Sequence, residues 1–323
     1  MPGRKRTAGR EALPGPVQGS LDLGLQSAPS ARRPEPSSPD PRQATEAGVL
    51  PPCRPFLKWA GGKRQLLPAL LAQVDRLGPF RAYHEPFLGG AALFFELFRQ
   101  GRTRDAVFLS DVNDRLMEAY RGVATDVESV IRHLRDHAER HGRDHYYATR
   151  ESIPDTLAGR AARLIYLNRT CFNGLYRENS RGLFNVPMGR YRNPTICDED
   201  ALRAASAALA RAHLRTGSFE VVLEQARPGD LVYFDPPYVP LSKTASFTDY
   251  AAGGFSDVDQ ARLAEVFAEL ASRGVHGMLS NSGTEAVRAL YSRFRIHRVL
   301  AARSVNSRAD RRGPVEEVLV TSF

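Results

Sequence analysis

The stretch L-V-Y-F-D-P-P-Y at residues 231–238 decides how this chain is expected to fold. Its first four residues are a continuous apolar run of the kind found in a buried strand, and its prolines open a loop. In open α/β sheets, ligand-binding and catalytic groups lie at the carboxyl ends of strands. We therefore predict an α/β sheet in which Asp235 stands at the position of a catalytic group.

The same loop has the groups needed to hold a planar base by its exocyclic amine. Such an amine is a poor nucleophile because its lone pair is delocalised into the ring. The Asp235 carboxylate and the Pro236 carbonyl can accept hydrogen bonds from its two N–H groups, and the prolines restrict the direction of that carbonyl. Tyr238 offers a stacking face for a base taken out of its duplex. An ordinary turn after a strand is the alternative, since Asp and Pro are common in turns.

Composition narrows the class of protein. A chain of 323 residues holds one large domain or two smaller ones. Its formal net charge of +9 favours an acidic partner, and nucleic acid is the leading candidate. Cys53, Cys171 and Cys197 lack C-x-x-C spacing, which argues against a disulfide framework and a zinc ribbon. No apolar stretch reaches transmembrane length, and the N-terminus lacks a signal-peptide core. We expect a monomeric cytoplasmic protein that does not bind membranes.

Residues 1–52 differ from the rest. Eleven of the 22 prolines lie within residues 1–55, and Ser, Gly, Ala and Arg fill much of the remainder. Such a segment buries too little apolar area to offset its ordering entropy, so we predict a disordered basic, proline-rich tail. Its Gly3-Arg4-Lys5-Arg6 start could contact DNA phosphates or act as an address. A solvated tail, or a start codon assigned too far upstream, is favoured over both.

Two glycine turns follow. In F-L-K-W-A-G-G-K at residues 56–63, we predict a short strand at 56–57, a turn at 60–62 and a helix over 64–72. The stretch is not a phosphate-binding P-loop, because Leu57 and Arg64 stand where that motif needs glycine and Ser or Thr.

The second turn, in H-E-P-F-L-G-G-A-A-L-F-F at residues 84–95, connects a strand ending at 83–85 to a helix over 91–98. A strand over 107–110 then ends at Asp111, 21 residues after Gly90. At that spacing an acidic residue reaches ribose hydroxyls in dinucleotide-binding folds. The full G-x-G-x-x-G pattern is missing, which disfavours NAD but allows an adenosine ligand. Packing glycines and a helix-capping Asp111 are the structural alternatives.

The middle of the chain, residues 116–215, is mainly helical by period. His133, His137, His141 and His145 are spaced by four, but no Asp, Glu or Cys completes a metal site and Gly142 interrupts the helix, so we expect no metal. Residues 168–191 instead predict a hairpin-like element for DNA, with a solvated basic loop as the alternative. Its turns are at 173–174 and 180–182, and its basic and aromatic residues are Arg169, Phe172, Tyr176, Arg177, Arg181, Phe184, Arg190, Tyr191 and Arg192.

The C-terminal third is expected to complete the sheet. We predict a helix over 258–272, a strand over 277–279, and a hairpin of strands over 296–301 and 315–321. Ser280-Asn281-Ser282 is expected to meet phosphate or base. Four arginines between the last strands grip the DNA backbone or form a plain charged loop: Arg303, Arg308, Arg311 and Arg312.

Together these motifs resemble the Dam-type DNA adenine-N6 methyltransferases. The shared stretches are F-L-K-W-A-G-G-K, E-P-F-L-G-G, S-D-V-N, N-R-T-C-F-N-G-L-Y-R with F-N-V-P-M-G-R-Y, D-P-P-Y, F-T-D-Y with G-G-F, S-N-S-G-T, and R-S-V-N-S with E-E-V-L-V. They run in the same order from residue 54 to 323. The resemblance implies a Rossmann-like sheet that binds S-adenosyl-L-methionine (AdoMet), over 53–115 and 216–323, and an inserted target-recognition domain over 116–215.

The resemblance also implies roles for individual residues. AdoMet would contact Trp59, Lys63, Phe87, Asp111 and Asp235. The flipped adenine would meet Asp235, Pro236 and Tyr238. Double-stranded DNA would meet Lys58, Asn173, Leu175, Arg177 and Pro187, with Arg177 reading a guanine of G-A-T-C, although Tyr176 and Glu178 stand where they could alter these contacts. We expect the enzyme to work at the nucleoid, in a restriction-modification, phage or housekeeping setting.

Two other functions remain open. A methyltransferase of the same fold could act on cytosine N4, RNA or a protein amide, although Asp235 favours adenine, since many of those enzymes carry Ser or Asn at its position. A C5-cytosine enzyme needs a nucleophilic Pro-Cys, and Pro52-Cys53 lies at the edge of the tail instead. A DNA-binding protein without activity is disfavoured because every acceptor is present.

Overall fold

The structure is a computed structural model that describes residues 53–59, 63–239, 255–302 and 314–323. These lie within one compact unit that extends from Val49 to Phe323. Four predictions fall outside the described residues: the disordered tail, the turn at 60–62, the F-T-D-Y stretch at 247–250 and the arginines between the last two strands.

The described residues build a seven-stranded sheet in the order β3-β2-β1-β4-β5-β7-β6. All neighbours are parallel except β7, which runs antiparallel to both β5 and β6. This confirms the expected Rossmann-like α/β fold. The strands are β1 Tyr83–Glu85, β2 Val107–Asp111, β3 Ala212–Thr216, β4 Leu231–Phe234, β5 His276–Ser282, β6 Arg295–Ala302 and β7 Pro314–Thr321.

The centre of the sheet lies between β1 and β4, which pair through Tyr83 and Leu231. All residues of both strands are buried, as expected for strands covered on two faces. From β1 the chain builds outward through β2 to β3, and from β4 it builds outward in the other direction to β5. This reversal is a topological switch point, where α/β sheets open a crevice for ligands.

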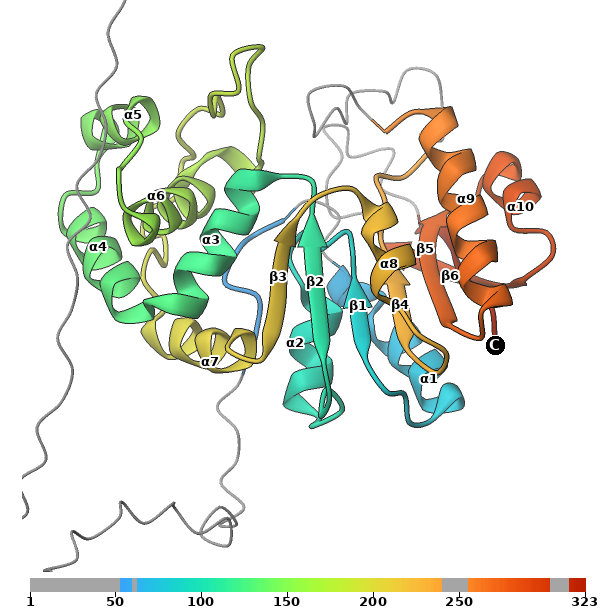
Figure 1. Cartoon of the computed structure of the whole chain (residues 1–323). Coiled ribbons are helices and arrows are strands. Elements are labelled where there is room, and N and C mark those ends of the chain that lie inside the picture. The colour runs from blue at the N-terminus through green and yellow to red at the C-terminus, as the bar shows by residue number, and fades with distance from the viewer. Residues whose placement is uncertain (1–52, 60–62, 240–254, 303–313) are drawn as a thin grey trace, which may run out of the picture. The chain divides into compact units, whose positions relative to one another are not determined.

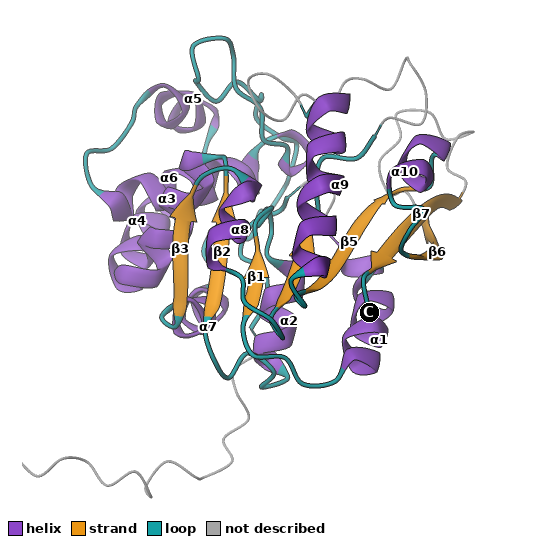
Figure 2. Ribbon diagram, turned by 45° about the vertical axis from the view of Figure 1, so that its right-hand side comes forward, coloured by secondary structure: helices purple, strands orange, loops and turns teal. Residues whose placement is uncertain are grey.

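Helices cover both faces of the sheet. Figure 2 shows α8 (Val222–Gln225) and α9 (Asp257–Ser272) in front of the strands, and α1 (Leu67–Leu77) and α2 (Ala92–Arg99) behind them. Ser256 and Asp259 form a capping box that starts α9. The remaining short elements are η2 (Lys63–Gln65), η4 (Phe219–Val221) and α10 (Glu285–Leu290). The apolar face of α9 is buried, at Leu263, Val266, Phe267 and Leu270.

Beyond the β3 edge, the inserted segment is mainly helical, as predicted (Figure 1). It contains α3 Asp114–Thr125, α4 Val127–Glu139, α5 Arg143–Glu151, α6 Leu157–Thr170, η3 Phe172–Gly174 and α7 Glu199–Leu209. Its end differs from the expected boundary at residue 215, because β3 begins at Ala212 and pairs with β2 along its whole length.

Three predicted elements need correction. Residues 56–57 form a bend rather than a strand, and both side chains are buried. The helix predicted over 64–72 begins at Leu67, because Pro68 is tolerated only in a first turn, and it continues until Gly78 takes a left-handed φ of 81°. The strand predicted over 277–279 is longer, since β7 pairs with it through Ser282.

Candidate functional site

Polar side chains gather at the carboxyl ends of the central strands. Glu85 ends β1, Asp111 ends β2, and Asp235 follows β4 directly, while Ser280 lies in β5. Because β2, β1, β4 and β5 are parallel neighbours, these ends meet at one edge of the sheet. The structure thus places the predicted Asp111 and Asp235 at the same edge of the sheet, at the ends of the two strands that flank β1.

One oxygen of Asp235 is held by two donors. Its Oδ1 accepts from Lys63 Nζ at 2.9 Å and from Ser280 Oγ at 2.8 Å. Its Oδ2 and the Pro236 carbonyl have no hydrogen-bond partner among the described residues. Burial raises the pKa of Asp235, and Lys63 and Ser280 oppose this rise. The two unpaired oxygens are the pair of acceptors expected for an exocyclic amine.

The following carbonyl is not available to a ligand. Gln260 Nε2 donates to the Pro237 carbonyl at 2.9 Å, and Asn281 Nδ2 donates to Gln260 Oε1 at 3.1 Å. The Val239 N–H also donates to Asn281 Oδ1 at 3.3 Å. The side chains of S-N-S were expected to meet phosphate or base. They are buried instead. Ser280 and Asn281 hold the D-P-P-Y loop through Asp235 and Val239, whereas Ser282 bonds to Asn281.

Lys63 lies at the centre of this site. Its Nζ is 2.8 Å from the Tyr238 hydroxyl and 3.9 Å from the centre of the Tyr238 ring, in addition to its contact with Asp235. The lysine is only 8% exposed, and its buried amine is paired with the Asp235 carboxylate. Lys63 covers one face of the Tyr238 ring, so a base would stack on the opposite face.

Asp111 fixes the second glycine turn. Its carboxylate accepts from the Gly89 N–H at 3.1 Å and from the Asn113 N–H at 2.9 Å. Burial raises the pKa of Asp111, and these backbone donors oppose the rise. Gly89 has a φ of 46°, and a Cβ there would lie 2.9 Å from Trp59 Cδ1, so only glycine fits. Contact of Asp111 with a ribose stays a prediction.

Glu85 is a buried acid beside Asp235. It is 3% exposed and accepts a hydrogen bond from the Tyr83 hydroxyl at 2.8 Å. Burial raises the pKa of Glu85 to about 8, and the nearby Asp235 adds to the rise. No role was predicted for this residue, although it opens the E-P-F-L-G-G motif.

The raised pKa predicts that stability falls as pH increases. Between the ordinary carboxyl pKa of 4.5 and about 8, the unfolded chain releases the Glu85 proton while the folded chain keeps it. The free energy of unfolding of the wild type should therefore fall between pH 5 and pH 8. In Glu85→Gln this fall should be smaller by on the order of 2 kcal/mol. Urea unfolding at both pH values measures it. Glu96→Gln, at a carboxylate paired with Arg99 on α2, is the control and should not stabilise the protein at pH 8.

Aromatic rings line both sides of the glycine turn. Phe87 stacks on Phe219 with ring centres 5.3 Å apart, and Phe255 packs against Phe87 edge-on. Trp59 stacks on Tyr176 at 5.2 Å. The predicted cofactor residue Trp59 therefore joins the glycine turn to the segment predicted to read DNA.

That segment is hairpin-like, with isolated bridges between Cys171 and Met188 and between Glu178 and Phe184. Residues 168–170 belong to α6, however, so the hairpin begins only at residue 171. The Arg177 side chain is exposed, and its Nε donates to Asn185 Oδ1 across the hairpin at 2.7 Å.

The predicted DNA residues of the two chain segments lie together. Asn168 is fully buried; its side chain accepts from the Lys58 N–H at 2.7 Å and donates to the Lys58 carbonyl at 2.6 Å. The Asn168 amide also donates to the Gly174 carbonyl at 3.2 Å. Asn173 has a left-handed φ of 55°, and the Pro187 carbonyl accepts from the Phe172 N–H. Leu175 lies between these segments, half-buried.

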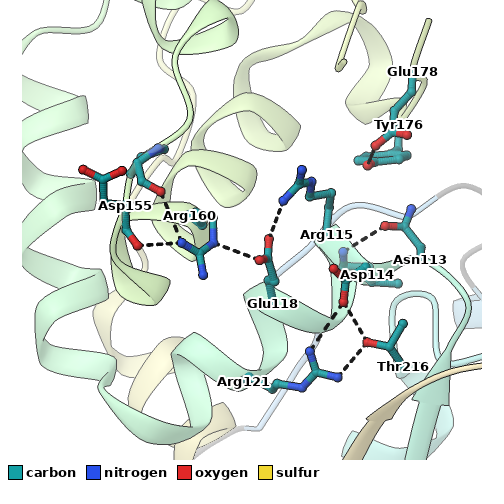
Figure 3. Close-up of polar contacts among 12 residues, drawn as sticks. Asn113, Asp114, Arg115, Glu118, Arg121, Asp155, Arg160, Tyr176, Glu178 and Thr216 are labelled. Carbon is teal, nitrogen blue, oxygen red and sulfur yellow. Dashed lines mark hydrogen bonds and ion pairs between the residues drawn. The ribbon is translucent and has the colours of Figure 1, made fainter. Parts of the chain in front are cut away.

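Tyr176 and Glu178, which could have altered DNA contacts, contact each other instead (Figure 3). Both line a pocket against α3 and α6. In that region Glu118 accepts from Arg115 at 3.1 Å and from Arg160 at 2.9 Å (Figure 3). The Glu118 contacts tie α3 to α6, and the Tyr176–Glu178 contact lies within the hairpin beside them.

The histidines give no metal centre. Gly142 separates α4 from α5, so the four do not share one helix. His137 and His145 approach each other at 2.9 Å, and burial lowers the pKa of His137 to about 4. In the part of the chain that the structure describes, no group of three potential ligands could hold a metal ion. Nor does any described helix have the length and hydropathy to cross a membrane.

Gln260 and Asn168 are two supporting residues to which the sequence analysis assigned no role. Gln260 was detectable, because it precedes Leu263 by three residues and Phe267 by seven, and a polar residue on the apolar face of a helix needs a partner. Asn168 opens the N-R-T-C-F-N-G-L-Y-R motif, but that motif did not predict its pairing with Lys58, which lies 110 residues away.

Comparisons with known proteins show the family of this chain. A family profile of D12 class N6 adenine-specific DNA methyltransferases matches residues 59–305. Type II methyltransferase M1.LlaDCHI of Lactococcus lactis subsp. cremoris is 42% identical over 84% of this chain and 95% of its own. Type II methyltransferase M.MjaIII of Methanocaldococcus jannaschii is 40% identical over 84% of this chain and 99% of its own. DNA adenine methylase of Escherichia coli K12 is 34% identical over 82% and 94%. Since the profile match covers most of the folded residues, this chain belongs to the D12 class N6 adenine-specific DNA methyltransferase family.

Proposed function

We propose that this enzyme transfers the methyl group of AdoMet to N6 of an adenine flipped out of duplex DNA, within G-A-T-C. We further propose that it acts as a monomer at the nucleoid, with its catalytic residues in 53–115 and 216–323 and its DNA-reading residues in the segment between them. The observation that carries the proposal is the pair of unpaired acceptors, Asp235 Oδ2 and the Pro236 carbonyl.

The chemistry follows from how these acceptors are held. Lys63 and Ser280 fix Asp235 Oδ1, and Gln260 fixes the Pro237 carbonyl, so the loop can present only Oδ2 and the Pro236 carbonyl to a substrate. Each would accept one N6–H of adenine and draw the nitrogen lone pair out of the ring. Because the acceptors are placed before substrate arrives, little reorganisation is needed in the transition state.

The edge of the sheet fits AdoMet. The left-handed Gly89 lets the backbone approach a ligand closely, and the Asp111 carboxylate suits a ligand that carries hydroxyls. Phe87 supplies an apolar surface, while Trp59 and Lys63 border the same turn. When bound, AdoMet supplies an electrophilic methyl group; the protein orients it toward the adenine.

Asp111→Ala should weaken AdoMet binding about tenfold, because a ribose would lose a charge-assisted partner and the glycine turn would lose its tie to β2. Isothermal titration calorimetry measures the affinity. Asp114→Ala is the matched control: this neighbouring carboxylate is 62% exposed and contacts Arg121 and Thr216 (Figure 3). Equal affinity of the wild type and Asp111→Ala would remove Asp111 from the cofactor site.

The recognition proposal rests on Arg177 and Lys58. Arg177 is anchored through Nε, which leaves its two terminal nitrogens for a bidentate contact with a guanine. Lys58 is exposed beside the hairpin, with Nζ 4.5 Å from the Tyr191 ring centre, and its backbone is fixed by Asn168. Asn173, Leu175 and Pro187 would complete the surface that meets the target.

Labelled AdoMet and unmethylated duplex DNA test the function, followed by sequencing of methylated bases. Methyl-adenine within G-A-T-C supports the whole proposal. Adenine methylation in another sequence would reject the site, whereas methyl-cytosine or a preference for RNA would reject the substrate. Tight DNA binding without transfer would indicate an inactive homologue.

A further inference from the structure

The hydroxyl of Tyr238 contacts both Lys63 and Glu317. It accepts from Lys63 Nζ at 2.8 Å and donates to Glu317 Oε2 at 3.0 Å. Burial raises the pKa of Tyr238 well above its ordinary value, and the nearby carboxylates of Asp235 and Glu317 add to the rise. The phenol therefore stays neutral and keeps the proton that it donates to Glu317.

Glu317 stands on a rigid part of the sheet. It lies in β7, opposite Ser282 of β5 on one side and Val299 of β6 on the other. Figure 2 shows β7 between these strands. A carboxylate on an internal strand is placed more firmly than one on a loop, whereas Tyr238 itself lies in a loop.

The neighbouring glutamate faces the opposite way. Glu316 contacts Arg288 and lies 3.5 Å from Arg298. Side chains alternate between the two faces of a strand, so only Glu317 can reach the D-P-P-Y loop. Of the two glutamates in E-E-V-L-V, Glu317 contacts the D-P-P-Y loop and Glu316 lies on the opposite face of β7.

We propose that Glu317 is a positioning residue that sets the plane of the Tyr238 ring for stacking on the target adenine. Lys63 covers one ring face, and Glu317 fixes the rotation of the ring through its hydroxyl. The stacking face is then presented to the base at a defined angle to Asp235 Oδ2 and the Pro236 carbonyl. This inference rests on the proposed function for its substrate, but the ring contact itself does not depend on any substrate.

Four variants test it: Glu317→Ala, Glu317→Gln, Tyr238→Phe, and Glu317→Ala combined with Tyr238→Phe. Glu317→Ala should lower the single-turnover methylation rate roughly tenfold or more, because a misplaced stacking surface misaligns the amine. Glu317→Gln should recover most of the rate, since its amide oxygen accepts from the same hydroxyl. Tyr238→Phe keeps the ring but removes the hydroxyl, so the double variant should be no slower than the slower single variant.

The control is Glu316→Ala, which should leave the rate within about twofold of wild type. AdoMet affinity should be unchanged in Glu317→Ala. The fluorescence of 2-aminopurine at the target position, which reports an unstacked base, should change in Glu317→Ala. Additive effects in the double variant, or a rate for Glu317→Ala within twofold of wild type, would overturn the positioning role.

A measurement without DNA separates this inference from the proposed function. Carbon-13 labelling of the tyrosine rings, with the Tyr238 signal assigned through Tyr238→Phe, reports the ring directly by nuclear magnetic resonance. We expect this signal to shift and to show faster ring motion in Glu317→Ala but not in Glu316→Ala. An unchanged signal would reject the role of Glu317, whatever the substrate. A wild-type enzyme that methylates no adenine would reject only the proposed function.

Discussion

Replacing Asp235 with asparagine is expected to lower the methylation rate by about 1000-fold. Lys63 and Ser280 both donate to Oδ1, so the asparagine must turn its amide oxygen toward them. Its NH2 group then stands in the place of Oδ2 and faces the N6–H groups of adenine. A donor would meet a donor, and the amine would lose the acceptor that frees its lone pair. Single-turnover methylation with labelled AdoMet measures the effect.

Asparagine is the sharper replacement because it keeps Lys63 paired. In Asp235→Ala the buried Lys63 would lose its carboxylate, which costs stability as well as activity. Asp230→Asn is the matched control: Asp230 is also buried, immediately precedes β4 and contacts His84 at 3.0 Å. It should change the free energy of unfolding and leave the rate nearly as it is. If Asp235→Asn kept a rate within tenfold of wild type, Asp235 would not be the amine acceptor.

The pattern of apolar residues predicted every strand of the sheet except β3, whose residues are only half-buried or exposed. The run at 231–234 is buried throughout as β4, and the two last strands pair as the expected hairpin. Such elements follow from local period and turn residues, which the chain carries in each segment. The corrections fall where local signals conflict: Pro68 delays α1, and 56–57 is an apolar bend rather than a strand.

The supporting residues of the site were harder to predict than its acceptors. Asp235 and Pro236 stand in a motif whose chemistry can be argued from the residues alone. Gln260 and Glu317 act through partners 23 and 79 residues away, and their contacts depend on the register of α9 and β7 against the D-P-P-Y loop. Register is set by tertiary packing and strand pairing, so local sequence patterns do not predict it.

The second large effect concerns recognition. Arg177→Ala is expected to reduce discrimination at one base pair of the target by up to about 150-fold. A bidentate arginine–guanine contact contributes about 1–3 kcal/mol to discrimination, and the upper value corresponds to this fold-change. Methylation rates on the target and on its single-base variants measure this. Asn185→Ala should show a smaller loss at the same position, because Asn185 holds the Arg177 Nε at 2.7 Å and so orients the guanidinium without touching the base.

Arg181 supplies the contrast, since it is exposed at the tip of the same hairpin. A phosphate contact carries no sequence information, so Arg181→Ala should weaken binding to every sequence alike. The slope of log affinity against log salt concentration should also fall by about the amount expected for one phosphate contact. Arg177→Ala should instead change the ratio between sequences more than the affinity for random DNA. If Arg177→Ala lost affinity equally on all sequences, it would be a phosphate contact too, and the reading of guanine would have to lie elsewhere on the hairpin.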